Sequence, residues 1–316
     1  MTSKFWRSRR VLVTGGHGFL GKHLVRKLEN LKPKSLYVPQ YPEFDLRNSD
    51  VCRKVVQDID LVLHLAAKVG GIGLNQRVPG EMFYDNLIMG AHLMEETRKA
   101  GVKKFVSIGT VCAYPKITPV PFTEDHLWDG FPEETNAPYG IAKKMLLVQG
   151  QAYRKQYGFN AIHLLPVNMY GPGDNFDPKS SHVIPALIKK FVDAKEKHKK
   201  SVTVWGTGNP TREFLFVEDG TEAIILASER YNDPEPVNIG SNYEISIREL
   251  AELIRKLVGY RGKISWNRSK PDGQPRRKLD VSLAKKKFGF EAKMTFKNGL
   301  ERTITWYIKH GRDHRN

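Results

Sequence analysis

The sequence predicts an α/β fold built on a doubly wound parallel sheet, with a smaller substrate-binding lobe toward the C-terminus. Two observations predict the sheet. Short apolar, β-branched runs alternate with helix-like segments through the first half of the chain, and a glycine-rich turn directly follows the first of these runs. With 316 residues, 40% of them hydrophobic, the chain is long enough for a large core. Ligands of such sheets bind beyond the carboxyl ends of the strands.

The expected elements follow one another in a regular order. Strands are expected at 10–14, 35–38, 60–67 and 103–110, and helices at 22–30, 49–57 and 83–101. After NMYGPGDNF (168–176) the elements shorten, and prolines and basic residues become more frequent. We therefore expect a dinucleotide-binding domain at residues 1–170 and a substrate lobe at 171–316, with part of the lobe's chain crossing back to the sheet.

Composition narrows the class of protein. A net charge of +17 would suit nucleic acid, but the basic residues are spread thinly and accompany no nucleic-acid-binding motif, so we do not expect nucleic acid as the main ligand. No segment approaches the roughly 18 apolar residues of a membrane helix, and the N-terminus does not read as a signal peptide. Two cysteines fit a reducing cytoplasm better than a disulfide framework. A cytoplasmic protein is expected.

A glycine triplet marks a dinucleotide site. Gly15, Gly18 and Gly21 form G-x-x-G-x-x-G between the first strand and the following helix. A tight turn, close approach of a pyrophosphate and close helix packing each require an absent side chain, and the helix N-terminus attracts the phosphates. After the second strand the chain has Gln40 and no acid before Glu43, so the acid that would favour NAD is missing. This indicates NADP slightly over NAD.

Tyr139 and Lys143 are the main catalytic candidates. Four residues apart on a predicted helix, they share one face, so the ammonium can lower the pKa of the phenol. Alone, the pair could be an ordinary contact on a helix. Thr110, at the end of a predicted strand, can donate a hydrogen bond to a substrate oxygen beside Tyr139. Cys112 follows two residues later and is either a small buried hydrophobe or a reactive thiol.

Seven stretches of the sequence resemble the extended short-chain dehydrogenase/reductases that act on nucleotide sugars. Within that family they are most similar to the epimerase-reductases that use GDP-4-keto-6-deoxy-mannose. The stretches are HLAAKVGGI (64–72), CAYPK (112–116), PYGIAK (138–143), NMYGPGDNF (168–176), SHVIPALIKKF (181–191), VWGTGNPTREFL (204–215) and SKPDGQPRRKLD (269–280). A dehydratase of the family would carry an Asp-Glu pair where this chain has Val111 and Cys112.

The resemblance implies a role for particular residues. It implies that Cys112 and His182 are the acid/base pair of epimerisation and that Thr110, Tyr139 and Lys143 are the reduction triad. Asp45 and Leu46, after the second strand, could meet the adenine edge of the cofactor. The candidate cofactor residues in full are Gly15, His17, Gly18, Phe19, Leu20, Gly21, Gln40, Asp45, Leu46, Leu65, Ala66, Ala67, Tyr139, Lys143, Pro166 and Asn168. The implied residues for the GDP-sugar are Asn168, Lys190, Trp205, Arg212, Asp272 and Arg277.

The expected activity is NADP(H)-dependent 3,5-epimerisation and 4-reduction of a GDP-linked deoxysugar, without a metal, by a homodimer. A thiol and an imidazole on opposite sides of a sugar ring can remove and deliver protons beside a ketone. A GDP-sugar epimerase without net reduction is the alternative, because it would share Cys112, Tyr139 and Lys143. Simpler roles also stay open. His182 could cap a helix, Arg212 could pair with Glu213, and Asn168 could only turn the backbone.

Overall fold

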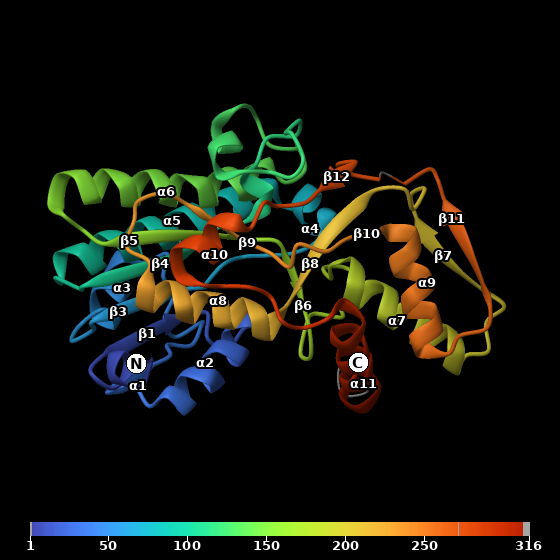
Figure 1. Cartoon of the computed structure of the whole chain (residues 1–316), viewed down its shortest axis with the longest axis horizontal. Coiled ribbons are helices and arrows are strands. Elements are labelled where there is room, and N and C mark those ends of the chain that lie inside the picture. Colours follow the sequence, from blue (N-terminus) through green and yellow to red (C-terminus); the bar gives the residue numbers. More distant parts are fainter. Residues whose placement is uncertain (1, 271, 312–316) are drawn as a thin grey trace.

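A six-stranded parallel sheet forms the larger part of the molecule and confirms the predicted fold class (Figure 1). The computed structural model describes residues 2–270 and 272–311. In the order of the sheet, the strands are β2 (Ser35–Tyr37), β1 (Arg10–Thr14), β3 (Leu61–His64), β4 (Lys104–Ile108), β5 (Ala161–Pro166) and β9 (Val237–Ile239). The direction of winding reverses between β1 and β3, which is where such sheets bind ligands.

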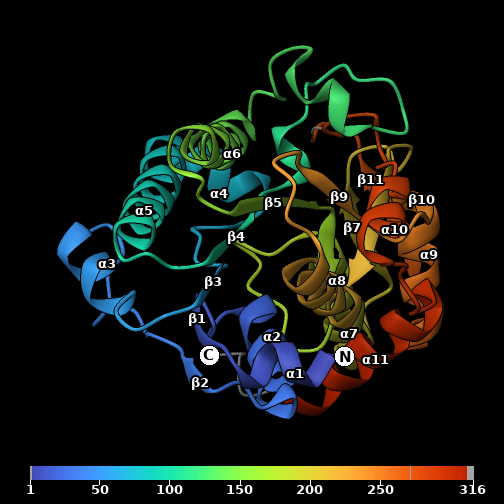
Figure 2. The ribbon, with the colours of Figure 1, turned by 60° about the vertical axis from the view of Figure 1, so that its left-hand side comes forward.

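Helices cover both faces of the sheet, as Figure 2 shows. One face carries α1 (Thr2–Arg7), α2 (Phe19–Leu31), α8 (Val217–Arg230) and α10 (Ser282–Phe288), and the other carries α3 (Ser49–Val55), α5 (Pro79–Lys99) and α6 (Ala137–Tyr157). Leu24 and Leu28 of α2 are fully buried on the first face, and Leu93 of α5 and Leu146 of α6 on the second. Leu24 and Leu28 lie four residues apart, which puts them on one apolar stripe of α2 facing the sheet.

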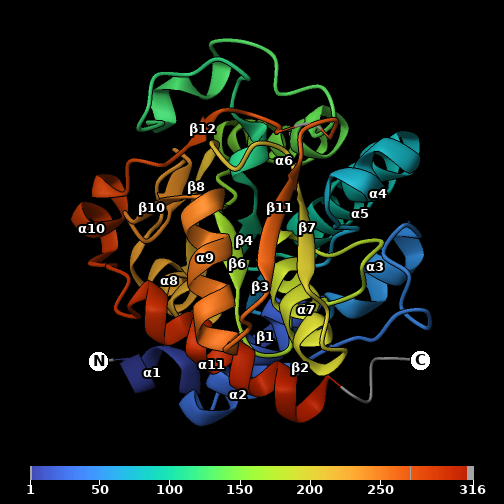
Figure 3. The same cartoon turned by 90° about the vertical axis from the view of Figure 1, so that its right-hand side faces the viewer.

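The second lobe has its own small sheets and its own core (Figure 3). Its strands are β6 (Asn168–Tyr170), β7 (Ser201–Trp205), β8 (Thr211–Phe216), β10 (Glu244–Ser246), β11 (Lys263–Asn267) and β12 (Arg276–Arg277). Its helices are α7 (Val183–Glu196), α9 (Ile247–Val258) and α11 (Phe296–His310), while α4 (Ile72–Arg77) and the short 3-10 helices η1 (Val111–Ala113) and η2 (Glu124–Trp128) belong to loops of the first domain. None of the helices in the described part of the chain is long and apolar enough to cross a membrane.

The chain passes between the two parts several times. Strand β8 lies in the lobe, but α8 and β9 follow it directly and belong to the large sheet. Residues 217–239 and 282–288 therefore pack with the first domain although they lie beyond residue 170. The domain boundary at residue 170 stays a prediction.

The buried carboxylate of Glu213 links segments of the chain that pass between the two parts of the molecule. Glu213 of β8 is 3% exposed, and its Oε1 accepts the N–H groups of Ser241 at 2.6 Å and Asn242 at 2.7 Å. Its Oε2 accepts the N–H of Leu279 at 2.8 Å. Successive residues of a strand point to opposite faces, so Arg212 points away from Glu213, and among the described residues no ion pair joins the two. The alternative of an Arg212–Glu213 pair is wrong.

Replacing this carboxylate should destabilise the fold. Glu213→Gln turns one acceptor oxygen into an amide group that cannot accept, and at least one buried N–H loses its partner. We expect the free energy of unfolding to fall by about 1.5–3 kcal/mol, measured by urea denaturation. The control is Glu301→Gln on the surface of α11. Equal denaturation midpoints for the two variants would show that Glu213 does not join the segments.

Candidate active site

A cavity of about 870 Å³ lies between the carboxyl edge of the large sheet and the second lobe. It brings together residues that are far apart in the sequence. The predicted residues that line it are Gly15, Gly18, Phe19, Leu20, Gly21, Leu65, Ala66, Ala67, Thr110, Cys112, Tyr139, Lys143, Pro166, Asn168, His182, Lys190, Trp205, Arg212, Asp272 and Arg277. All five candidate catalytic residues are among them.

The glycine turn forms one end of the cavity. Gly15 has φ +71°, and a Cβ there would lie 2.6 Å from the backbone nitrogen of Ala66 at the end of β3. A Cβ on Gly21 would lie 2.1 Å from the carbonyl oxygen of Gly15. Gly18 is the N-cap of α2 and brings no side-chain oxygen to the first N–H groups of the helix. The turn is therefore a close-fitting cradle with an open helix N-terminus, which suits a pyrophosphate.

Four predicted cofactor residues lie outside the lining of the cavity. His17 and Gln40 are exposed, and the His17 ring is 3.4 Å from the carbonyl oxygen of Val38. Asp45 accepts hydrogen bonds from Arg47, and the guanidinium lowers the pKa of the carboxyl. Leu46 lies in a turn before α3 and is 5% exposed, because it packs in the buried cluster that contains Cys52 and Val55 of α3. The parts assigned to these four in cofactor binding stay predictions.

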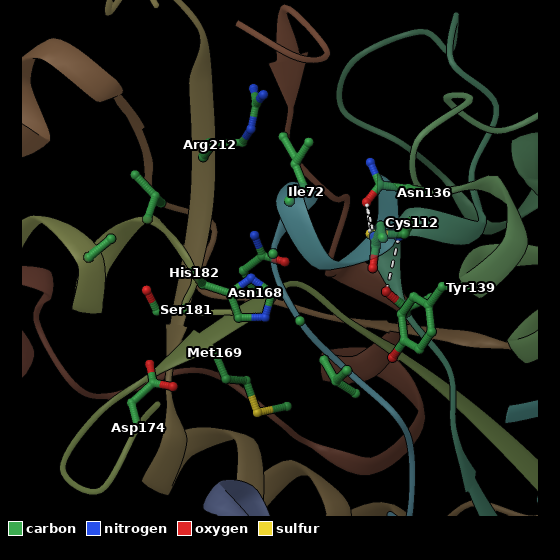
Figure 4. A pocket seen from close by; sticks show the side chains of 18 of the residues that line it. Ile72, Cys112, Asn136, Tyr139, Asn168, Met169, Asp174, Ser181, His182 and Arg212 are labelled. Carbon is green, nitrogen blue, oxygen red and sulfur yellow. Dashed lines mark hydrogen bonds between the residues drawn. The ribbon is translucent and has the colours of Figure 1, made fainter. Parts of the chain in front are cut away.

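The stretch after β4 presents a hydroxyl and a thiol to the cavity (Figure 4). The Thr110 hydroxyl accepts the N–H of Cys112 at 3.1 Å and so caps η1. Arg277 donates from Nη1 to the Cys112 sulfur at 3.5 Å, and that sulfur is 3.9 Å from Oδ1 of Asn136. The sulfur therefore lines the cavity with a guanidinium on one side and an amide oxygen on the other. Cys112 is thus a polar-contacted residue of the cavity, and its part in the chemistry stays a prediction.

Tyr139 and Lys143 enter the cavity from the first turns of α6, which lies directly against η1. A Cβ on Gly140 would be 2.3 Å from the carbonyl oxygen of Cys112. Burial lowers the pKa of Lys143 to about 8, which leaves the side chain mostly charged at neutral pH.

The pKa of the Tyr139 phenol moves against expectation. Burial raises it, the Cys112 charge raises it further, and a hydrogen bond with Thr110 lowers it. The prediction that Lys143 makes the phenol more acidic is not met in the protein alone, because desolvation of the phenolate outweighs nearby charge. The phenol stays protonated, which suits a proton donor.

His182 reaches the cavity from the second lobe. It is the N-cap of α7 and, as Figure 4 shows, its ring comes from a different side of the cavity than Cys112 and Tyr139. Its side chain makes no cap hydrogen bond within the described helix start, so helix capping does not account for it. Burial lowers the pKa of the imidazole below its usual value, which keeps the ring neutral near pH 7.

Two arginines face the cavity side by side. Arg212 of β8 and Arg277 of β12 are paired residues of neighbouring strands. Arg277 is 8% exposed, and burial together with the Arg277 charge lowers the pKa of Arg212 to about 10. Among the described residues neither forms an ion pair with a carboxylate, whereas the adjacent Arg276 makes two hydrogen bonds of 2.7 Å with Glu244. One buried and one half-buried guanidinium group without a carboxylate partner among the described residues favour an anionic ligand.

The far end of the cavity is aromatic and basic. Trp205 is 59% exposed, with the ammonium groups of Lys190 and Lys270 at 5.6 Å and 5.3 Å from its rings. Lys190 also donates to the carbonyl oxygen of Thr203 at 3.2 Å. The Asp272 carboxylate accepts both the N–H and the hydroxyl of Thr207 at 2.7 Å, so in this structure it holds a loop.

Several lining residues were not predicted. Asn136 connects Cys112 to Asn75, whose amide donates to Asn136 at 3.1 Å. The position of Asn136 directly before the Y-x-x-x-K helix was the available signal. Asp174 is 9% exposed, and burial raises the pKa of its carboxyl to about 7. The sequence around Asp174 gave no indication that this carboxyl is buried. Among the described residues, no three His, Cys, Asp or Glu side chains gather as a metal site.

Comparison with known proteins agrees with this geometry. The chain is 41% identical over 305 residues to GDP-L-fucose synthase 1 of Arabidopsis thaliana. The aligned region covers 96% of this chain and 94% of that protein. It is similar to the structure of a GDP-L-fucose synthetase from Naegleria fowleri bound to NADP, with TM-score 0.88, 28% identity and coverage of 98% and 96%. It also resembles a GDP-6-OMe-4-keto-L-xylo-heptose reductase from C. jejuni, with TM-score 0.91, 26% identity and coverage of 96% and 98%.

The match to a family model spans most of the sheet domain and the start of the lobe. Residues 11–240 match the model described as the NAD dependent epimerase/dehydratase family. That range contains the glycine turn, Thr110, Cys112, Tyr139, Lys143 and His182. The chain therefore belongs to the NAD dependent epimerase/dehydratase family, in the extended short-chain dehydrogenase/reductase class.

Proposed function

We propose that this protein converts GDP-4-keto-6-deoxy-mannose to GDP-L-fucose by 3,5-epimerisation followed by NADPH-dependent reduction at C4. The observation that carries the proposal is the shared cavity. Thr110, Cys112 and Tyr139 come to it from the sheet edge, and His182 comes from the opposite lobe. The fucose synthase relatives and the similar NADP-bound structure support both the substrate and the choice of NADP over NAD.

Epimerisation requires two groups on different sides of the sugar. The C4 ketone acidifies the hydrogens on C3 and C5, and inversion removes a proton from one face and adds one to the other. Cys112, with the Arg277 guanidinium 3.5 Å from its sulfur, is suited to remove a proton, and the neutral His182 imidazole can exchange one. The hydroxyl groups of Thr110 and Tyr139 can stabilise the enolate oxygen by hydrogen bonds.

Reduction of the ketone adds a hydride to C4 and a proton to the C4 oxygen, the same oxygen that carries the charge of the enolate. The glycine turn of Gly15, Gly18 and Gly21 would hold NADPH, which when bound would supply the hydride for C4. Because burial raises the pKa of Tyr139, the phenol keeps its proton until the C4 oxygen becomes strongly basic and takes it. The Lys143 ammonium lies one helical turn away on α6 and stabilises the resulting phenolate.

Substrate anchoring explains the basic half of the cavity. Among the described residues Arg212 and Arg277 form no ion pair with a carboxylate, and the diphosphate of a GDP-sugar would supply the negative charge that pairs with them. Trp205 offers an exposed aromatic face that suits a nucleobase. The charge of the substrate thus accounts for the adjacent guanidinium groups of the buried Arg277 and the half-buried Arg212.

The decisive experiment mixes the purified protein with GDP-4-keto-6-deoxy-mannose and follows oxidation of NADPH and, separately, of NADH. We expect NADPH oxidation and formation of GDP-L-fucose. Deuterium uptake at C3 and C5 without oxidation of either cofactor would instead identify the alternative, a GDP-sugar epimerase without net reduction. Neither oxidation nor exchange would overturn the proposal.

Cys112→Ser separates the first step from the second. A hydroxyl gives up its proton much less readily than a thiol, so we expect exchange at C3 and C5 in deuterated water to fall by about 100-fold or more. Circular dichroism and NADPH binding should be unchanged. Exchange at the normal rate would make Cys112 a packing residue.

Tyr139→Phe should have the complementary effect. The phenol is the proton donor to the C4 oxygen, and its removal should lower NADPH oxidation by about 10²–10⁴-fold. Exchange at C3 and C5 should fall by less, because Thr110 still stabilises the enolate oxygen. A reduction rate close to that of the natural protein would rule out the role given to Tyr139.

Arg212→Gln tests the diphosphate site. Loss of one charge-assisted contact worth about 1.5–3 kcal/mol should raise the KM for the GDP-sugar by roughly 10- to 100-fold. The matched control is Arg276→Gln on the neighbouring strand, since Arg276 already pairs with Glu244 at 2.7 Å. Equal KM values for the two variants would show that Arg212 does not bind the substrate.

The homodimer and the cytoplasmic location remain part of this proposal. Exposed Phe83 and Tyr84 on α5, and Val148 and Tyr157 on α6, form apolar surface on two neighbouring helices and support their pairing with a second copy. The division into a cofactor domain at residues 1–170 and a GDP-sugar lobe at 171–316 is proposed with the crossings described above.

A further inference from the structure

A row of polar side chains crosses the large sheet just below its carboxyl edge. The row consists of Thr14 on β1, His64 on β3, Ser107 on β4 and His163 on β5. Each is directly paired with the next in the register of the sheet, so all four side chains point to the same face. We call these four residues the polar row. Two residues earlier on these strands lie Leu12, Val62, Phe105 and Ala161, which pack with Leu146 of α6. The polar row therefore lies on the face that α6 covers (Figure 2).

The polar row is buried, and its hydrogen bonds are incomplete. All four residues are at most 3% exposed. The Thr14 hydroxyl and Nδ1 of His64 are hydrogen bonded at 2.8 Å. Among the described residues, His64 Nε2, Ser107 Oγ and both ring nitrogens of His163 have no partner. Buried polar atoms rarely stay unpaired, and ordered water is the usual partner of those that the protein itself does not pair.

The row lies beneath the reduction triad. Lys143 is close enough for its charge to lower the pKa of both His64 and His163, after the larger effect of burial. The pKa of His163 falls to about 3, so the ring is neutral and does not repel the ammonium. A Cβ on Gly109 would be 2.3 Å from Nε2 of His163, which places this ring directly against the residue before Thr110.

The groups around Lys143 come from three elements. His64 faces it from β3 and His163 from β5, while Tyr139 lies one turn earlier on α6. Beyond the phenol, the charge of Cys112 acts on Tyr139. Lys143 itself is 2% exposed, so its ammonium depends on nearby polar atoms for solvation.

We propose that the polar row is a hydrated positioning site, in which water bound by His64, Ser107 and His163 solvates the Lys143 ammonium and holds it beneath Tyr139. The proposal rests on the role of Lys143 in the proposed reduction. His163 and Ser107 are positioning residues, since they act on the reaction through Lys143. Neutral imidazoles can both donate to and accept from such water, which an apolar side chain cannot do.

The test compares variants that keep or remove the polarity of the row. His163→Leu and Ser107→Ala remove partners of the water, whereas His163→Gln keeps a donor and an acceptor. Poorer solvation disfavours the charged lysine, so its pKa should fall below about 8 in the first two variants. We expect the alkaline limb of the kcat profile for NADPH oxidation to move about one pH unit to lower pH. His163→Gln should restore it. The KM for the GDP-sugar and the exchange at C3 and C5 should stay the same.

A second measurement does not depend on activity. In protein labelled with ¹³C at the lysine ε-carbons, the Lys143 signal is the one lost in Lys143→Arg, and its titration can be followed without substrate. The control is Ile162→Val, which trims the opposite face of β5 and should shift neither the titration nor the kcat profile.

An unchanged Lys143 titration in both His163→Leu and Ser107→Ala would overturn the inference. Ser107→Ala removes a single buried oxygen and still decides the question if His163→Leu does not fold. Failure of the natural protein to oxidise NADPH would instead count against the proposed function, and the titration would still decide about the polar row.

Discussion

The parallel alignment of β1, β3, β4 and β5 is the constraint on which the rest of the site depends. All four strands end at one edge, so the turns that follow them must share a small space. That crowding explains why Gly15 has no room for a side chain against Ala66. It also brings Thr110, after β4, beside the turn that receives the cofactor. The lobe completes the site from the other side, through His182 and the two arginines.

Desolvation then sets the chemistry of the groups gathered at this edge. Burial pushes the pKa of Tyr139 up and that of Lys143 down to about 8, so the two groups become a proton donor and a cation at the limit of its charged state. Burial also raises the pKa of Asp174 to about 7, which reduces the negative charge inside the cavity. With Arg212 and Arg277 free of carboxylate partners among the described residues, the interior favours an anionic ligand.

The local sequence pattern was enough to predict the secondary-structure elements and the candidate site residues. The strands at 10–14 and 35–37, the glycine turn and the Y-x-x-x-K helix lie close to their expected positions, since each is encoded by neighbouring residues. The neighbours of each side chain could not be predicted in that way. Arg212 and Glu213 are adjacent in sequence but point to opposite faces of β8. Leu46 is buried in a cluster with Cys52 and Val55 of α3 and with residues of the sheet, and these neighbours come from separate elements.

The sequence by itself determined the fold class and the family and named the candidate site residues, because glycine spacing, helical periodicity and family motifs are properties of short segments. Only the tertiary structure decided how these groups are solvated and paired. It placed the Arg277 guanidinium 3.5 Å from the Cys112 sulfur, 165 positions away in the sequence. It also set His64, Ser107 and His163 in one register beneath Lys143. Electrostatic environment depends on distances between side chains from separate elements, and those distances exist only after the chain has folded.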